Sequence, residues 1–163
     1  MRSDFVVFIL SHGRANNVVT VDTLKKYGYT GKYYIVCDDE DSQLADYKKR
    51  FGDDNVLVFS KSAVDFDIMD NFPGNKVVVY ARNAVLEFAK KLGVKYFWEL
   101  EDDYYDFQYR PIEYDEVTGC ERLAYYRITD LDSVIDAFID YVDNEKFRKT
   151  MAAPEGTAAE PQI

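Results

Sequence analysis

The chain is 163 residues long, with 47% hydrophobic and 31% charged residues. This length fits one domain, and the composition supplies both a core and a solvated surface. It excludes a disordered chain, a collagen-like repeat and a membrane protein, since no run of about 18 apolar residues occurs. The first apolar run, 5–10, leads into Ser11-His12-Gly13-Arg14 and not into a cleavage site, so we expect no secretory signal.

The formal net charge of −10 disfavours binding to nucleic acid through the chain's own surface, because phosphate neutralisation needs a basic patch. The acids gather in two stretches: 99–116 holds eight acids and one base, and 130–145 holds six acids and no base. Crowded carboxylates repel one another unless water or a cation neutralises them. A divalent-cation site is therefore one hypothesis for the first stretch, and a solvated helix face is the interpretation of the second.

Cysteine and histidine are scarce. Cys37, Cys120 and His12 are too few to build a four-ligand zinc site. Cys37 ends an apolar run and is predicted to be a buried thiol. We expect a reduced, cytoplasmic compartment.

The first hundred residues alternate between two kinds of segment. Four apolar runs are predicted to be strands buried on both faces, because they are continuous and do not alternate with polar residues: 5–10, 33–37, 56–59 and 94–100. Between them, apolar residues recur at helical spacing, and a glycine follows the last periodic residue each time: Gly28, Gly52 and Gly93.

The helices between these strands are also predicted from the sequence. Asn16 or Asn17 is expected to cap the first helix and Ser42 the second, and the third is expected to span 78–92. Strands and helices in this order form right-handed βαβ units. The fold class is therefore α/β, with a mostly parallel, Rossmann-like sheet and flanking helices.

Residues after 103 follow a different pattern. Segments 104–114 and 121–128 flank a turn at 115–119 and predict a hairpin, and Thr129 or Asp130 is expected to cap a final helix. The inward face of that helix is expected to carry Leu131, Val134, Ile135, Phe138, Ile139 and Val142. We expect one domain over 1–149, a disordered tail over 150–163, and a functional or mobile loop over 61–76.

Ligands of open α/β sheets bind beyond the carboxyl ends of the strands, so the residues that follow the apolar runs are the site candidates. These are Ser11, Gly13 and Arg14 after the first run, Asp38 and Asp39 after the second, and Glu101, Asp102 and Asp103 after the fourth, with Arg82 in the helix before it.

The acidic strand end is the strongest of these candidates. Side chains alternate along an extended chain, so Glu101 and Asp103 are expected on one side and Asp102 on the other. Two carboxylates so placed can share Mg²⁺ or Mn²⁺ and leave positions for phosphate oxygens. The alternative is an acidic, solvated turn.

The other candidates each have two interpretations. A carboxylate of Asp38 or Asp39 can accept a hydrogen bond from a base or a ribose, while Glu40 and Asp41 are equally explained as acids of a helix start. Arg14 and Arg82 can pair with phosphate or be ordinary surface arginines. We interpret His12 as a hydrogen-bonded structural residue.

Several signatures of other α/β proteins are absent from the sequence. There is no Gly-x-Gly-x-x-Gly after the first strand and no Gly-x-x-x-x-Gly-Lys-Ser/Thr, which disfavours dinucleotide and P-loop chemistry. No Gly-x-Ser-x-Gly elbow is present.

Taken together, these residues resemble a GT-A glycosyltransferase. The resemblance rests on the opening strand and loop 5–14, on Asp38-Asp39, on Ala81-Arg82-Asn83, and on the strand end 98–103, which corresponds to that family's DxD motif. It covers residues 5–104 and extends more weakly to 145. More narrowly, the chain resembles the phage-type TET/JBP-associated glycosyltransferases, which are thought to add sugars to hydroxymethylated pyrimidines in DNA.

The resemblance implies a nucleotide-sugar donor of the UDP type and a Mn²⁺ or Mg²⁺ ion. Asp38 or Asp39 would hold the base, Glu101 and Asp102 the ribose or the sugar, and Asp103 the metal on the diphosphate, with Arg82 contacting the donor. The resemblance does not identify a general base or say whether the sugar's configuration is retained or inverted.

Two functions of different classes follow from the sequence. The first is a metal-dependent glycosyltransferase that modifies phage DNA in the host cytoplasm. The alternative is a non-catalytic GT-A-fold module, truncated before the acceptor half, that binds a nucleotide sugar or a protein partner. A nucleotidyltransferase is disfavoured, because the loop 11–14 is too short for the glycine-rich loop of that class.

Overall fold

The computed structural model describes residues 1–63 and 77–144. Most of the loop expected over 61–76, and the tail expected over 150–163, lie outside the described residues.

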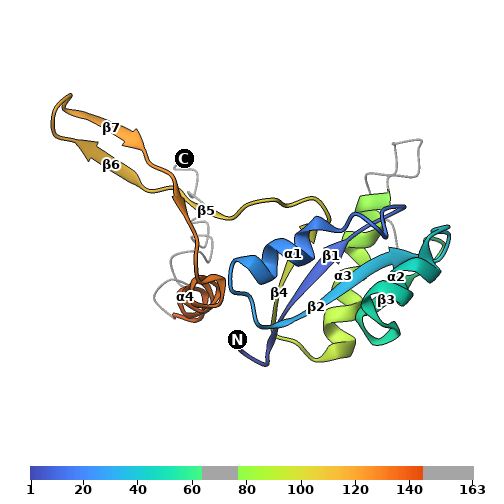
Figure 1. Cartoon of the computed structure of the whole chain (residues 1–163). Helices are drawn as coiled ribbons and strands as arrows, with labels where there is room; N and C mark the ends of the chain where they lie inside the picture. Colours follow the sequence, from blue (N-terminus) through green and yellow to red (C-terminus); the bar gives the residue numbers. More distant parts are fainter. Residues whose placement is uncertain (64–76, 145–163) are drawn as a thin grey trace, which may run out of the picture.

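A four-stranded, entirely parallel sheet forms the centre of the molecule (Figure 1). Its strands lie in the order β3-β2-β1-β4. They span Phe5–Leu10 (β1), Lys32–Asp38 (β2), Val56–Phe59 (β3) and Tyr96–Glu101 (β4). Because all four run the same way, their carboxyl ends meet at one edge, as the sequence predicts. The fourth strand begins two residues later than expected.

Both faces of this sheet are covered by helices, which explains why β1 is apolar at every position. Phe5, Val7 and Ile9 pack into one core, and Val6, Phe8 and Leu10 into the other. A strand with two buried faces gains nothing from polar alternation.

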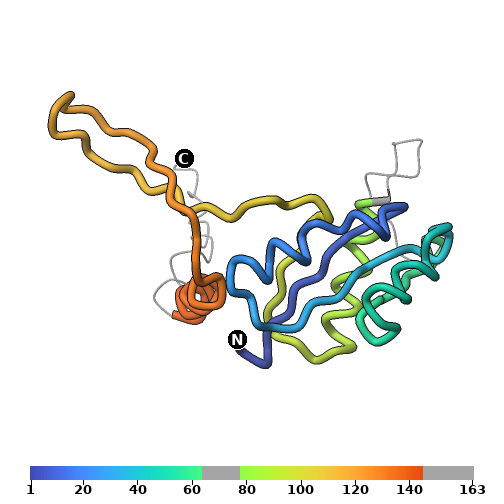
Figure 2. Tube along the Cα trace, viewed as in Figure 1, coloured from blue at the N-terminus to red at the C-terminus, as the bar shows by residue number. Residues whose placement is uncertain are grey.

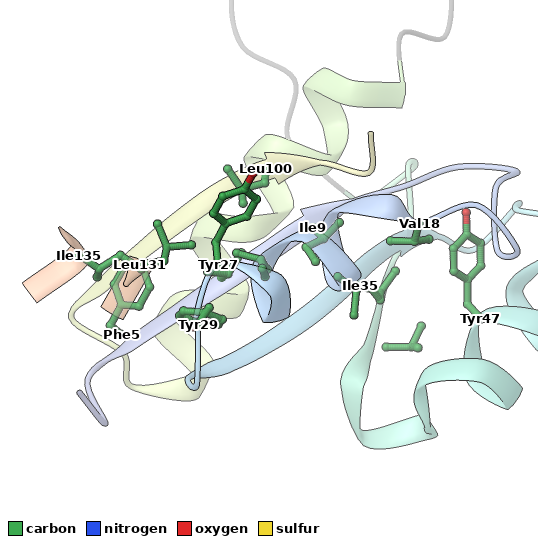
Figure 3. Close-up of a cluster of buried hydrophobic side chains, with 14 of the residues drawn as sticks. Phe5, Ile9, Val18, Tyr27, Tyr29, Ile35, Tyr47, Leu100, Leu131 and Ile135 are labelled. Atoms are coloured by element: carbon green, nitrogen blue, oxygen red, sulfur yellow. The ribbon is translucent and has the colours of Figure 1, made fainter. Parts of the chain in front are cut away.

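The helices divide between the two faces. α1 (Val19–Lys26) and α4 (Leu131–Asp143) contribute to the first core, together with Tyr47 of α2 (Leu44–Phe51), as Figure 3 shows. α3 (Val77–Leu92) covers the opposite face through Ala81, Ala84, Val85 and Ala89. A short 3-10 turn, η1 (Asp53–Asn55), leads into β3.

The predicted side-chain caps of the first two helices are wrong. α1 begins after Val18 and α2 after Gln43, and neither helix start has a capping side chain. The N–H groups of Val19 and Thr20 donate instead to the main-chain carbonyl of Asp102, at 2.8 and 3.2 Å. A distant backbone group therefore satisfies donors that local caps usually take.

A narrow arm follows β4 and projects away from the sheet (Figures 1 and 2). It consists of two antiparallel pairs: β5 (Gln108–Tyr109) with β8 (Tyr126–Arg127), and β6 (Ile112–Asp115) with β7 (Cys120–Leu123). The predicted hairpin is thereby confirmed, although its strands are shorter than expected. The stacked rings of Tyr104 and Phe107 lie at its base, and Phe107 also contacts Tyr27.

The final helix, α4, buries a narrower stripe than predicted. Asp130 caps it by accepting from the Ser133 N–H at 3.1 Å, as one of the two predicted caps. Leu131, Ile135 and Ile139 are buried, but Phe138 and Val142 are exposed. α4 contacts the first core through one row of side chains, so positions away from that row face solvent.

Two further predictions concern burial and membranes. Cys37 is buried, as expected, and burial raises the pKa of its thiol to about 12. Among the helices that the structure describes, none has the length and apolar character that a bilayer crossing requires.

The narrow stripe of α4 generates a stability prediction. Ile135 is 0% exposed and Phe138 is 57% exposed. Ile135→Ala should lower the free energy of unfolding by about 2 kcal/mol or more, because it leaves a cavity in the core. Phe138→Ala, the matched control on the same helix, should cost less than about 1 kcal/mol. Urea denaturation measures both, and equal losses would contradict this placement of α4.

Candidate functional site

A cavity of about 270 Å³ lies at the carboxyl edge of the sheet. The loop after β1 contributes Ser11, His12 and Arg14, and the end of β4 contributes Glu101, Asp102 and Asp103. Apolar side chains complete the lining: Leu10, Phe59, Val78 and Ala81. Segments that are far apart in the sequence thus meet where the parallel topology predicts.

The three acids at the end of β4 divide between two environments. Asp102 is buried, Asp103 is exposed and Glu101 is half-buried. The alternation expected from an extended chain is therefore observed, because the middle carboxylate turns inward while its neighbours remain accessible.

Asp102 fastens the loop after β1 to the sheet. One carboxylate oxygen accepts from the Ser11 hydroxyl at 2.5 Å, and the other accepts from the Arg14 guanidinium at 2.9 Å. The attraction of the Asp102 charge raises the pKa of Arg14. Both carboxylate oxygens of Asp102 are therefore engaged within the protein, which gives this residue a structural role.

Tyr47 extends this network into α2. Its hydroxyl lies 2.7 Å from the Ser11 hydroxyl and accepts the Arg14 N–H at 2.8 Å. Because an ionised Asp102 can only accept, Ser11 must donate to it, and Tyr47 must then donate to Ser11. Burial raises the pKa of Tyr47 to about 12, so this hydroxyl keeps its proton at neutral pH.

Glu101 and Asp103 remain available to a ligand in the cavity. Arg82 of α3 pairs with Glu101 at 2.7 Å, and this hydrogen bond raises the pKa of Arg82. Arg14 lies 3.6 Å from Asp103. The accessible carboxylates therefore each have an arginine neighbour, so positive and negative groups alternate along this wall.

Asp38 lies beside the cavity and does not line it. It is 0% exposed, and its oxygens contact His12 Nδ1 at 2.6 Å and Lys61 Nζ at 3.0 Å. Burial acts to raise the pKa of Asp38, but the hydrogen bonds from Lys61 and His12 outweigh it, and the pKa is lowered. Asp38 is consequently ionised at neutral pH.

His12, Asp38 and Asp41 form a compact group whose ligand atoms lie within 4.8 Å of one another. Both carboxylates already have donors, since the Gly13 N–H bonds Asp41 at 2.8 Å and Lys61 bonds Asp38. The Lys61 ammonium supplies the positive charge at this position. The group is therefore explained as the hydrogen-bonded anchor of the loop after β1.

The remaining predicted site residues lie outside the cavity lining. Gly13 faces Asp41 through its N–H, and Asp39 has an exposed side chain and a main-chain bond to Phe59 at 2.9 Å. Arg82 reaches the site through Glu101. The structure thus brings Ser11, Arg14, Glu101, Asp102 and Asp103 together at one cavity.

Two contributors to the site were not identified from the sequence. Tyr47 lies at helical spacing among apolar residues, which predicts burial, and the signal for its role is that a buried tyrosine hydroxyl normally needs a partner. Lys61 follows β3 at the same sheet edge, and that position was the signal that could have identified it.

A parallel sheet flanked by helices, with acids and arginines at its carboxyl edge, is consistent with the Rossmann-like fold of glycosyltransferases. The model of the TET-associated glycosyltransferase family matches residues 5–147, and the chain belongs to this family. No curated protein and no solved structure matches the chain significantly.

The burial of Asp102 generates a prediction about its role. Asp102→Ala should lower the free energy of unfolding by about 2 kcal/mol, because buried donors lose a charged acceptor. Asp103→Ala, the matched control on an exposed neighbour, should change it by less than about 0.5 kcal/mol. Chemical denaturation of both variants checks this, and a stable Asp102→Ala variant would contradict the structural role.

Proposed function

We propose that the chain binds a UDP-type nucleotide sugar together with Mn²⁺ or Mg²⁺ and transfers the sugar to an acceptor. The observation that carries this proposal is the pair Glu101 and Asp103, which line the cavity while the carboxylate between them is buried. The family membership supports a nucleotide-sugar donor.

The accessible carboxylates fit a hard divalent cation. Mg²⁺ and Mn²⁺ prefer oxygen ligands and keep positions for water and phosphate oxygens. Asp103 would bind the ion and Glu101 would assist it, once Arg82 turns from Glu101 toward the donor. The ion would neutralise charge on the departing diphosphate.

The arginines suit the other half of a diphosphate site. Arg14 and Arg82 already face carboxylates of the wall, at 2.9 and 2.7 Å. A guanidinium can exchange such a partner for a phosphate with two parallel hydrogen bonds. The hydrogen bond from the Arg14 N–H to the Tyr47 hydroxyl, at 2.8 Å, would hold the main chain of Arg14 in place during that exchange.

For the acceptor, we propose a hydroxymethylated pyrimidine in DNA, on the strength of the resemblance described above. The net charge of −10 weakens any encounter with DNA, so a partner or a low salt concentration would be needed to observe it.

A second candidate function is a donor-binding module that acts through contacts with another macromolecule. The arm favours it, because large apolar side chains are exposed there: Ile112, Tyr114, Val117 and Leu123. Turnover separates the two candidates, since a module binds the donor without consuming it.

Donor binding is tested by calorimetric titration of UDP and UDP-glucose with Mn²⁺ and with EDTA. We expect binding only with the metal, and at least about a tenfold weaker affinity in Asp103→Ala, which removes a ligand of the ion. Asp46→Ala, an exposed acid on α2, is the matched control and should bind as the wild type does. Absence of metal-dependent binding in the folded chain would refute the proposed donor site.

Transfer is tested with UDP-glucose and two DNA duplexes that differ only in carrying hydroxymethylcytosine or cytosine. The proposal predicts glucosylation of the hydroxymethylated duplex alone, detected as a mass increase of the DNA. Donor binding without transfer or hydrolysis would favour the module.

A further inference from the structure

The cavity has an acidic side and an apolar side, and the order of the strands determines where each side lies. The ends of β4 and β3 lie on opposite sides of β1. Glu101 and Asp103 therefore form an acidic side, while Phe59 with Val78 and Ala81 of α3 forms an apolar side. If the proposed function is correct, the diphosphate and its metal belong on the acidic side, and the flat nucleobase belongs on the apolar side.

Asp38 is one of the two residues, with Asp39, that the resemblance assigns to the base, but its carboxylate is already engaged. Its Oδ1 accepts from Lys61 Nζ at 3.0 Å and from the Glu40 N–H at 3.1 Å, and its Oδ2 contacts His12. The side chain of Asp38 is 0% exposed, whereas that of His12 is 45% exposed and lines the cavity.

The contact with Asp38 determines what His12 can offer to a ligand. An ionised carboxylate only accepts hydrogen bonds, so His12 Nδ1 carries the proton that it shares with Asp38 at 2.6 Å. In a neutral imidazole with a proton on Nδ1, Nε2 is an acceptor. Because Nδ1 is engaged with Asp38 and His12 lines the cavity, Nε2 is the ring nitrogen left for a ligand there.

We propose that His12 determines nucleobase specificity, its Nε2 accepting the imide N–H of uracil, with Asp38 as the positioning residue that fixes the ring. Cytosine carries an unprotonated nitrogen at the equivalent ring position. Two acceptors would then face each other without a proton, which leaves both unpaired. Such a mismatch costs about tenfold or more in affinity.

The test is calorimetric titration of UDP and CDP in the presence of Mg²⁺. We expect UDP to bind at least about tenfold more tightly than CDP.

His12→Asn is the informative variant, since its amide can still donate to Asp38 but offers no second ring nitrogen. It should bind UDP and CDP with similar affinities. Asp38→Asn, whose amide tolerates either tautomer of His12, should also reduce the ratio. Asp39→Asn is the matched control on the exposed neighbour and should leave the ratio unchanged. Circular dichroism and thermal unfolding establish that each variant is folded.

The outcomes separate the two proposals. Equal affinities in the wild type, or an unchanged ratio in His12→Asn, would overturn the role of His12 and leave the donor site intact. Loss of discrimination in Asp39→Asn alone would assign the base to that carboxylate and also overturn it. If the folded wild type binds neither nucleotide, both the proposed function and this inference fall.

Discussion

The arrangement of the cavity depends on one residue, Asp102, through both its side-chain carboxylate and its main-chain carbonyl. Its carboxylate receives Ser11 and Arg14 from the loop after β1, and its carbonyl receives the first N–H groups of α1. Through Ser11 the same network reaches Tyr47 of α2. A buried carboxylate is costly unless donors surround it, and this requirement fixes the loop and, through Tyr47, α2 relative to β4. The main-chain carbonyl of Asp102 fixes the start of α1.

This constraint distinguishes the roles of residues that look alike in the sequence. Two aspartates, Asp38 and Asp102, are buried acids that position the cationic and imidazole side chains around them. Glu101 and Asp103, which flank Asp102 in the sequence, are the more exposed acids that line the cavity. In a parallel sheet each strand ends at the same edge, so structural and ligand-facing acids come to lie within one network.

The sheet was predictable because its physical basis is local. β1 is apolar throughout since both its faces are buried, and α3 ends one residue before Gly93, which adopts a positive φ. The cavity lies at the carboxyl edge of the sheet, which is where the topology predicts a ligand site. The start of α1 was not predictable, because its donors are satisfied by a residue more than eighty positions away. The partners of Tyr47 and Lys61 likewise depend on tertiary contacts that no local pattern encodes.

Because the first N–H groups of α1 are already hydrogen-bonded, this helix start also limits how the cavity could bind a negatively charged group. In many nucleotide-binding folds the first helix directs free N–H groups and the positive end of its dipole at a pyrophosphate. In this chain the carbonyl of Asp102 accepts hydrogen bonds from the N–H groups of Val19 and Thr20, so those donors are not available to a ligand. Under the proposed function, recognition of a diphosphate would rely on side chains and a cation, which can be removed and replaced, instead of on the fixed field of a helix. This reliance on side chains and a cation agrees with a sequence that lacks a glycine-rich loop after its first strand.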